Sequence, residues 1–300
     1  MFIAQSNKPE NKFWHYLIGS LAIFVGSMIG QLPLGLAVLY QVLVRKKEYP
    51  KTDKALYGMF ESNFFLFLVL ISFVFAFYTL YLVVKKYHNQ QFKDIITSRK
   101  AVDWIRFFTA FFIWVVFSIS IVLITYFSNE SNLIIQFKLI PFLILSAIAI
   151  ILIPIQTSTE ELVFRGYLMQ GFYNLSKNKW LPLLMTSVIF GGMHWFNPEV
   201  SEMGSIVMVY YIGTGLFLGI ITLMDEGTEL ALGFHAANNL VAALLVTTEY
   251  SVLQTHAIFK DLSKPEMGVE IFMPIIFYVI LGYIFSKKYH WHHWKEKLIG

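Results

Sequence analysis

Long runs of apolar residues, each near the length that crosses a lipid bilayer, constrain this chain more than any other feature. A membrane-spanning helix needs about 20 consecutive apolar residues. Eight runs approach this length, at 13–44, 63–84, 104–127, 137–155, 180–196, 205–224, 230–248 and 271–286. The first run exceeds the apolar core of a signal peptide, about 7–15 residues, so we expect it to be retained. The sequence predicts an all-α, polytopic transmembrane bundle of about eight spanning helices around an intramembrane polar cavity.

The composition excludes two other classes of protein. Apolar residues make up 57% of the chain and charged residues 14%, whereas soluble domains carry about 25% charged residues. This shortage of charge excludes a soluble globular protein, and the apolar content excludes intrinsic disorder. The chain has no cysteine, which removes a disulfide framework or a thiolate nucleophile. The net charge of +4 comes from short basic clusters between apolar runs, which is typical of loops beside anionic lipid. We expect a lipid bilayer, and no nucleic acid, as a partner.

The distribution of lysine and arginine predicts an orientation. With the N-terminus inside, the inner segments hold 13 of these residues and the outer segments 8. Because basic loops tend to remain in the cytoplasm, this difference favours a multi-pass protein of a bacterial cell membrane with both termini cytoplasmic. The basic segment 45–47 in the first outer loop argues in the opposite direction.

Ionisable side chains inside the apolar runs are few and concentrated in three places. Each costs about 2.5–3.5 kcal/mol to insert, so such residues are functional candidates by default. They are Glu160, Glu161 and Arg165 in one helix, His194 in the next, and His235, accompanied by Asn239, in a third. Glu161 and Arg165 are four residues apart and can pair on one helical face. Glu160 points about 100° away from Glu161, and its depth matches that of His194 across the 177–179 turn.

This combination of side chains suits the activation of water. A carboxylate beside imidazoles in a low-dielectric cavity can act as a general base. A histidine and an asparagine one turn apart can donate hydrogen bonds to a developing oxyanion. Other hydrolase motifs are missing, because the sequence contains no His-Glu-x-x-His, Gly-x-Ser-x-Gly or Gly-x-Gly-Asp pattern. The residues therefore predict a water-activated acyl hydrolase within a membrane.

Three motifs in order resemble those of a known family. Glu160-Glu161-x-x-x-Arg165, Phe190-x-x-x-His194 and His235-x-x-x-Asn239 are similar to the motifs of the CPBP family. These are the CAAX-processing and bacteriocin-processing membrane proteases, also called the ABI family, whose best-known members are type II CAAX prenyl endopeptidases. The resemblance covers about residues 140–245.

The resemblance implies roles for these residues in an intramembrane glutamate-type endopeptidase. Glu160 would activate water with the help of His194, while His235 and Asn239 would bind the scissile carbonyl and its oxyanion. The remaining motif residues, Glu161, Arg165 and Phe190, would support the site. The substrate would be a membrane-associated peptide or protein. No cofactor is expected, although one carboxylate and two histidines could form an open zinc site.

The same resemblance divides the chain into three regions. Residues 1–136 would form N-terminal transmembrane helices without a signature, and 137–248 the catalytic core. Residues 249–300 would contain a loop, the last transmembrane helix and a basic, aromatic tail. The tail's histidines fit an interfacial belt with its tryptophans and lysines better than a metal site.

Two alternatives come from other functional classes. A non-proteolytic membrane scaffold, as in bacteriocin immunity, would bind a sensor kinase or a cell-wall enzyme and would keep its function without Glu160. A transporter or proton relay would need a polar path across the bilayer, whereas the polar residues here form one island. Recognition of a prenyl group stays open at this point, because prenylated CAAX proteins are a eukaryotic need.

Overall fold

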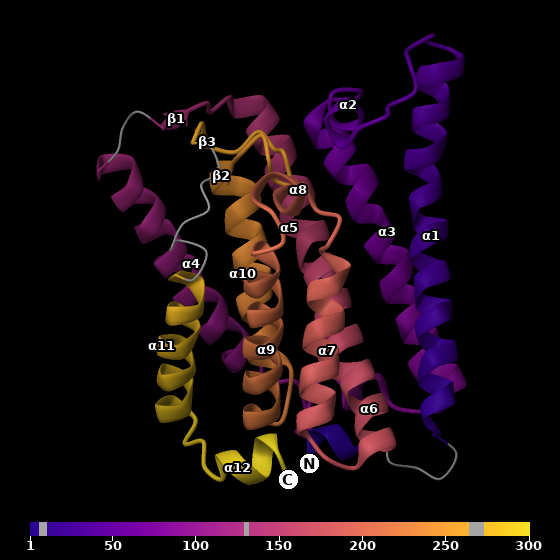
Figure 1. Ribbon diagram of the computed structural model, residues 1–300, viewed down its shortest axis with the longest axis vertical. Coiled ribbons are helices and arrows are strands. Elements are labelled where there is room, and N and C mark those ends of the chain that lie inside the picture. Colours follow the sequence, from indigo (N-terminus) through magenta and orange to yellow (C-terminus); the bar gives the residue numbers. More distant parts are fainter. Residues whose placement is uncertain (6–10, 129–131, 264–272) are drawn as a thin grey trace.

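Every apolar run of the sequence contains a helix in the computed structural model (Figure 1), which describes residues 1–5, 11–128, 132–263 and 273–300. Part of the loop predicted after residue 248 and the first residues of the last predicted span, together 264–272, lie outside the described residues. The helices corresponding to the runs are α1 (Phe13–Leu43), α3 (Ser62–Leu82), α4 (Trp104–Ser128), α5 (Leu139–Glu161), α7 (Trp180–Met193), α9 (Val207–Asp225), α10 (Glu229–Leu245) and α11 (Met273–Lys288).

Shorter helical segments connect or extend these helices. Two of them are π-helical, η2 (Val83–Tyr87) after α3 and η4 (Leu162–Leu168) after α5. The others are η1 (Phe2–Ala4), α2 (Asp53–Tyr57), η3 (Phe92–Ile95), α6 (Met169–Ser176), α8 (Pro198–Met203) and α12 (Trp294–Leu298). The path α5–η4–α6 is one continuous helical rod, Leu139–Ser176, which extends beyond the apolar run 137–155.

Length and hydropathy identify a multi-pass membrane protein. Within the described part of the chain, five segments are long and apolar enough to cross a membrane: Phe13–Leu43, Ser62–Tyr87, Trp104–Ser128, Leu139–Ser176 and Val207–Asp225. Their outer faces expose large apolar side chains, such as Leu36 at 65% and Ile105 at 75%, which lipid would cover. The helices α7 and α10 are apolar but shorter, so a total of eight spans stays a prediction.

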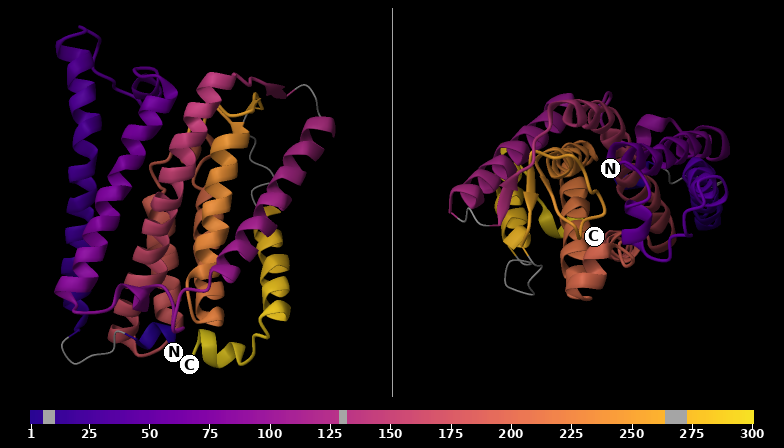
Figure 2. Two further views of the ribbon diagram at one scale, coloured as in Figure 1. Left: turned by 180° about the vertical axis from the view of Figure 1, so that it is seen from behind. Right: turned by 90° about the horizontal axis from the view of Figure 1, so that it is seen from above.

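The helices form a bundle with a hairpin on its flank. The α1–α3 hairpin contacts the remainder mainly through α3 against α5, while α10 packs between α4 and α5 and α7 packs along α9. Figure 2 shows the hairpin at one edge of the bundle when the molecule is seen from above. The two termini lie at the same end of the bundle (Figure 1).

A small β-sheet at the opposite end is the one departure from the all-α prediction among the described residues. Its strands β1 (Leu133–Ile135), β3 (Phe259–Asp261) and β2 (Val246–Thr247) lie in that order. Strand β3 pairs antiparallel with β1 and parallel with β2. The sheet joins the loop after α10 to the connection between α4 and α5, where short extended segments satisfy each other's backbone groups.

Glycines allow the central helices to approach closely. A Cβ at Gly233 of α10 would lie 2.1 Å from the carbonyl oxygen of Phe107 in α4, and one at Gly215 of α9 would lie 3.0 Å from the Cα of Ser187 in α7. Small residues permit such backbone contacts between membrane helices. A second glycine of α9, Gly219, lies close to α7 as well, because a Cβ there would be 2.5 Å from Cδ1 of Leu183.

Candidate active site

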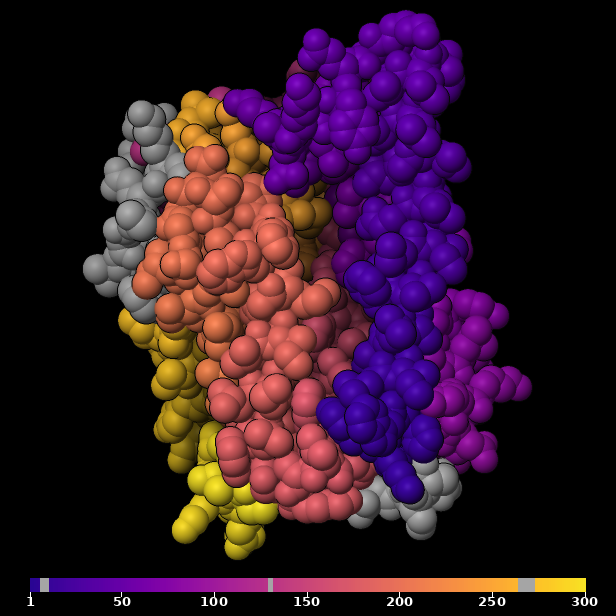
Figure 3. All heavy atoms as spheres, turned by 45° about the vertical axis from the view of Figure 1, so that its right-hand side comes forward, coloured from indigo at the N-terminus to yellow at the C-terminus, as the bar shows by residue number. Residues whose placement is uncertain are grey.

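A pocket of about 650 Å³ lies where α3, α5, α7, α8, α9 and α10 meet. In Figure 3 the surface is hollowed between the indigo N-terminal helices and the coral segment that contains α7. Of the residues predicted to form a site, four line this pocket, namely Glu160, Phe190, His194 and Asn239. The other three lie deeper, since Glu161 and Arg165 are fully buried and His235 is 7% exposed.

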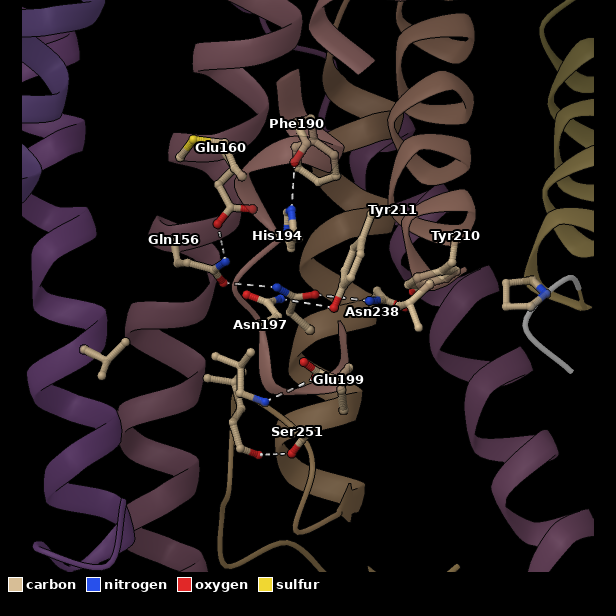
Figure 4. Close-up of a pocket in the computed structure, with 18 of the residues that line it drawn as sticks. Gln156, Glu160, Phe190, His194, Asn197, Glu199, Tyr210, Tyr211, Asn238 and Ser251 are labelled. Atoms are coloured by element: carbon tan, nitrogen blue, oxygen red, sulfur yellow. Dashed lines mark hydrogen bonds between the residues drawn. The ribbon is translucent and has the colours of Figure 1, made fainter. Parts of the chain in front are cut away.

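Glu160 enters the pocket from the last turn of α5. One turn earlier, the Nε2 of Gln156 donates a hydrogen bond of 2.7 Å to Glu160 Oε1. This contact fixes one carboxylate oxygen and leaves Oε2 directed at His235, whose Nε2 is 3.6 Å away. The π-helical segment η4 begins two residues later, and such segments occur often at functional sites. The carboxylate is therefore held, rather than free to rotate, at the wall of the pocket (Figure 4).

His194 follows the last residue of α7 and is oriented by two contacts. Its Nδ1 lies 2.8 Å from the carbonyl oxygen of Phe190. Because a carbonyl can only accept, Nδ1 carries a proton and Nε2 is the nitrogen left for chemistry. The ring of Tyr211 stacks on the imidazole at 4.3 Å between centroids, and the hydroxyl of Tyr211 accepts a 3.1 Å hydrogen bond from Asn197.

A buried ionic cluster supports the site from behind. Glu161 Oε1 accepts hydrogen bonds from Arg165 Nη1 at 2.9 Å and from His235 Nδ1 at 2.7 Å. The predicted pairing of Glu161 with Arg165 is thus present, and Glu161 also orients His235. The guanidinium of Arg165 lies 4.3 Å from the centroid of the Phe190 ring and donates to the carbonyl oxygen of Gly215 at 3.3 Å. Arg165 therefore ties three helical elements together beneath the pocket.

Asn239 belongs to a chain of side-chain amides. Its Nδ2 donates to Gln156 Oε1 at 3.2 Å, and its Oδ1 accepts from Asn238 at 3.1 Å. Asn238 in turn accepts from the Trp114 indole at 3.1 Å. These hydrogen bonds connect α4 through α10 to α5 and end on Glu160. It leaves the second Nδ2 proton of Asn239 for another acceptor.

Several polar residues of the pocket are not among those predicted from the sequence, namely Gln156, Asn197, Glu199 and Tyr211. Gln156 had a local signal, because it is a polar residue four positions before Glu160 in an apolar run. Tyr211 and Glu199 had none, since their approach depends on how α8 and α9 pack. Among the described residues, no three His, Cys, Asp or Glu side chains are placed to hold a metal ion. The expectation of no cofactor stays a prediction.

The fold defines the class of protein, an α-helical multi-pass membrane protein with a partly polar pocket between its helices. Residues 138–241 match the family described as type II CAAX prenyl endopeptidase Rce1-like, so this part of the chain is a CPBP-family domain. The matched segment contains all three motifs, and the family recognised from them is confirmed.

The whole chain also has a relative of nearly equal length. It is 28% identical over 289 residues to the uncharacterized protein YyaK of Bacillus subtilis (strain 168), covering 96% of this chain and 95% of that protein. The similarity therefore includes the helices outside the family domain. No solved structure matches the chain.

Proposed function

We propose that the protein is an intramembrane glutamate-type endopeptidase that hydrolyses a peptide bond of a membrane-associated peptide or protein. The observation that carries this proposal is the arrangement of Glu160. Its carboxylate lines the same pocket as His194, accepts a hydrogen bond from Gln156 and lies beside a buried histidine. A general base needs such a fixed position beside a space that a substrate and a water can enter.

In the proposed reaction, Glu160 removes a proton from water and the resulting hydroxide attacks the carbonyl carbon of the peptide. Nε2 of His194 assists by binding the same water. The carbonyl oxygen becomes an oxyanion, for which Asn239 and His235 are the proposed hydrogen-bond donors. Because the Nδ1–H of His235 is bonded to Glu161, His235 donates from Nε2 as the imidazolium, with protons on both nitrogens. When the intermediate collapses, the C–N bond breaks and the proton held by Glu160 passes to the leaving nitrogen. One water is consumed, and the products are one carboxyl group and one amine.

The remaining motif residues have supporting roles in this proposal. Glu161 holds His235 by its Nδ1, so that Nε2 faces the reaction site. Arg165 neutralises Glu161 and packs against Phe190, whose carbonyl sets the proton position on His194. We propose residues 137–248 as the catalytic core, preceded by supporting helices and followed by the last helix and tail.

We further propose that the protein is a bacterial cell-membrane protein with both termini cytoplasmic. The lysine and arginine distribution supports this orientation, as does the position of both termini at one end of the bundle (Figure 1). The pocket extends toward the end that carries α8 and residues 251–253, which is opposite to the termini. In this orientation a substrate would enter from the outer half of the membrane.

The test is peptide cleavage by the purified protein in lipid nanodiscs, with a library of apolar peptides analysed by mass spectrometry. We expect products from the wild type and none from Glu160→Gln or His194→Ala. The control Glu202→Gln changes an exposed carboxylate of α8 and should cleave as the wild type does. Captured peptide on Glu160→Gln would identify the substrate. Equal cleavage by wild type and Glu160→Gln would refute the proposal, and function that survives this change would favour a scaffold.

A further inference from the structure

A second carboxylate lines the pocket. Glu199 lies in α8, the short helix that follows His194, and belongs to the same pocket as Glu160. Figure 4 shows Glu160 and His194 toward one end of the drawn residues and Glu199 with Ser251 toward the other. The amide groups of Gln156, Asn197 and Asn238 lie between the two ends. A substrate chain in the pocket would therefore contact Glu199 at a distance from the bond that Glu160 acts on.

Only one carboxylate oxygen of Glu199 accepts a hydrogen bond from the described residues. Its Oε1 accepts the backbone N–H of Val252 at 3.2 Å. Its Oε2 is buried, and no donor among the described residues reaches it. A buried carboxylate oxygen without a donor is costly, because it loses its hydrogen bonds to water and gains none in return. Accordingly, burial raises the pKa of Glu199 above its ordinary value. A donor brought in by a ligand would remove this penalty once the side chain turns Oε2 toward the pocket.

The charged side chains that line the pocket, among the described residues, are all acidic. Among the described residues that line it are two carboxylates, Glu160 and Glu199, and no lysine or arginine. The guanidinium of the motif, Arg165, is fully buried and paired with Glu161. Most other lining groups are apolar or neutral, among them Leu70, Phe73 and Val207. A cation on an apolar stem would therefore meet both a carboxylate and an apolar wall, whereas a carboxylate would meet like charge.

We propose that Glu199 forms a cation subsite, which binds the side chain of a lysine or arginine in the substrate peptide. This subsite rests on the proposed endopeptidase function, because the peptide that it binds is the substrate of that reaction. The subsite selects a peptide that is apolar except for a basic side chain. It disfavours a peptide whose C-terminal carboxylate enters the pocket near Glu199. Glu199 would be a specificity-determining residue that takes no part in the bond cleavage.

The first test measures binding and does not need the peptidase reaction. The probes are 4-phenylbutylamine and its neutral counterpart 4-phenylbutanol, titrated calorimetrically into protein in nanodiscs. A charge-assisted hydrogen bond is worth about 1.5–3 kcal/mol, so the wild type should bind the amine at least about tenfold more tightly. Glu199→Gln retains an acceptor for the Val252 N–H and should bind both probes equally. Glu202→Gln on the same helix should keep the preference of the wild type.

The second test uses cleavage. A peptide that the wild type cuts is synthesised with lysine or its neutral isostere norleucine at each position around the cut. We expect one position at which lysine raises kcat/KM at least about tenfold, and a ratio near one in Glu199→Gln. Equal binding of amine and alcohol by the wild type would overturn the inference, as would an amine preference that survives in Glu199→Gln. Cleavage that does not depend on Glu160 would instead refute the proposed glutamate-type mechanism, while the binding result would still decide whether the cation subsite exists.

Discussion

Gln156 donates a hydrogen bond of 2.7 Å to Glu160, one turn further along α5. This contact directs the carboxylate that we propose as the general base. Gln156→Met keeps the size of the side chain and removes its amide. Loss of a hydrogen bond to a charged group is worth about 1.5–3 kcal/mol, so we expect kcat to fall about 10- to 100-fold, measured as initial cleavage rates at saturating peptide.

The control for this change lies on the same helix. Ser146 donates to the carbonyl oxygen of Phe142 within α5, away from the pocket, so Ser146→Ala should leave kcat unchanged. Thermal unfolding followed by tryptophan fluorescence would establish that both variants fold. Full activity in a folded Gln156→Met protein would show that Gln156 does not position Glu160.

Variants of the Glu161–Arg165 pair should show that its effect on stability can be restored without restoring cleavage. Arg165→Met leaves a buried carboxylate without its cation, which should destabilise the protein by about 3–5 kcal/mol. Glu161→Met combined with Arg165→Met removes both charges and should regain much of the melting temperature. The double variant also removes the acceptor of His235 Nδ1, so cleavage should stay abolished. Activity in the stable double variant would contradict the role given to this pair.

Gly233 predicts a strong packing effect close to His235. A Cβ at this position would meet the backbone of Phe107 at 2.1 Å, so Gly233→Ala must displace α4 from α10. Overpacking of this kind costs about 1–3 kcal/mol, and we expect a lower melting temperature. Apart from its chain neighbours and the adjacent backbone of α11, a Cβ at Gly282 would meet no atom of the described residues within 4 Å, so Gly282→Ala should be neutral or mildly stabilising. Equal melting temperatures of the two variants would show that the α4–α10 contact is looser than this distance implies.

Glu226 predicts a pH-dependent stability at the end where the termini meet. It accepts hydrogen bonds from the Phe2 N–H and, at 2.6 Å, from the Lys297 ammonium. Burial raises its pKa, but these donors outweigh that effect and hold the pKa of Glu226 below its ordinary value of 4.5. A lowered carboxyl pKa contributes stability above the ordinary value, and this contribution is lost as the pH falls through the folded-state pKa.

The measurement compares the melting temperatures of wild type and Glu226→Gln from pH 7 downward. The wild type should be more stable at pH 7, and the difference should shrink below pH 4.5. Glu202→Gln, which changes an exposed side chain of α8, should follow the wild type throughout. A difference that is independent of pH would exclude an ionised Glu226 as its source.

The proposed orientation predicts which residues an impermeant reagent reaches. The chain contains no cysteine, so a single-cysteine variant has no other thiol in the protein that the reagent could label. In intact cells, a membrane-impermeant maleimide should label Glu202→Cys, at an exposed position of α8, and should not label Lys295→Cys near the C-terminus. Both should be labelled after the membrane is permeabilised. The reverse pattern would place the termini outside and reverse the direction from which the pocket is entered.

Local patterns account for what could be predicted about the site. The pairing of Glu161 with Arg165 and the contact of His194 with Phe190 are both between residues four apart on one helix. Such contacts depend on helix geometry alone, so spacing reveals them. The position of Gln156 follows the same rule. In contrast, the stacking of Tyr211 on His194 and the approach of Glu199 to the pocket connect separate elements, and no spacing in the chain encodes them.

The sequence by itself determined the helices, the membrane class and the family motifs, because the length of an apolar run and the cost of a charge in lipid are properties of each segment alone. Only the tertiary structure decided that His235 is held by Glu161 behind the pocket, that Gln156 links Asn239 to Glu160, and that Glu199 shares their pocket. These relationships depend on how closely helices pack, which contacts such as Gly233 against Phe107 determine. The charges that the apolar runs isolate thus become a site only when several helices bring them to one pocket.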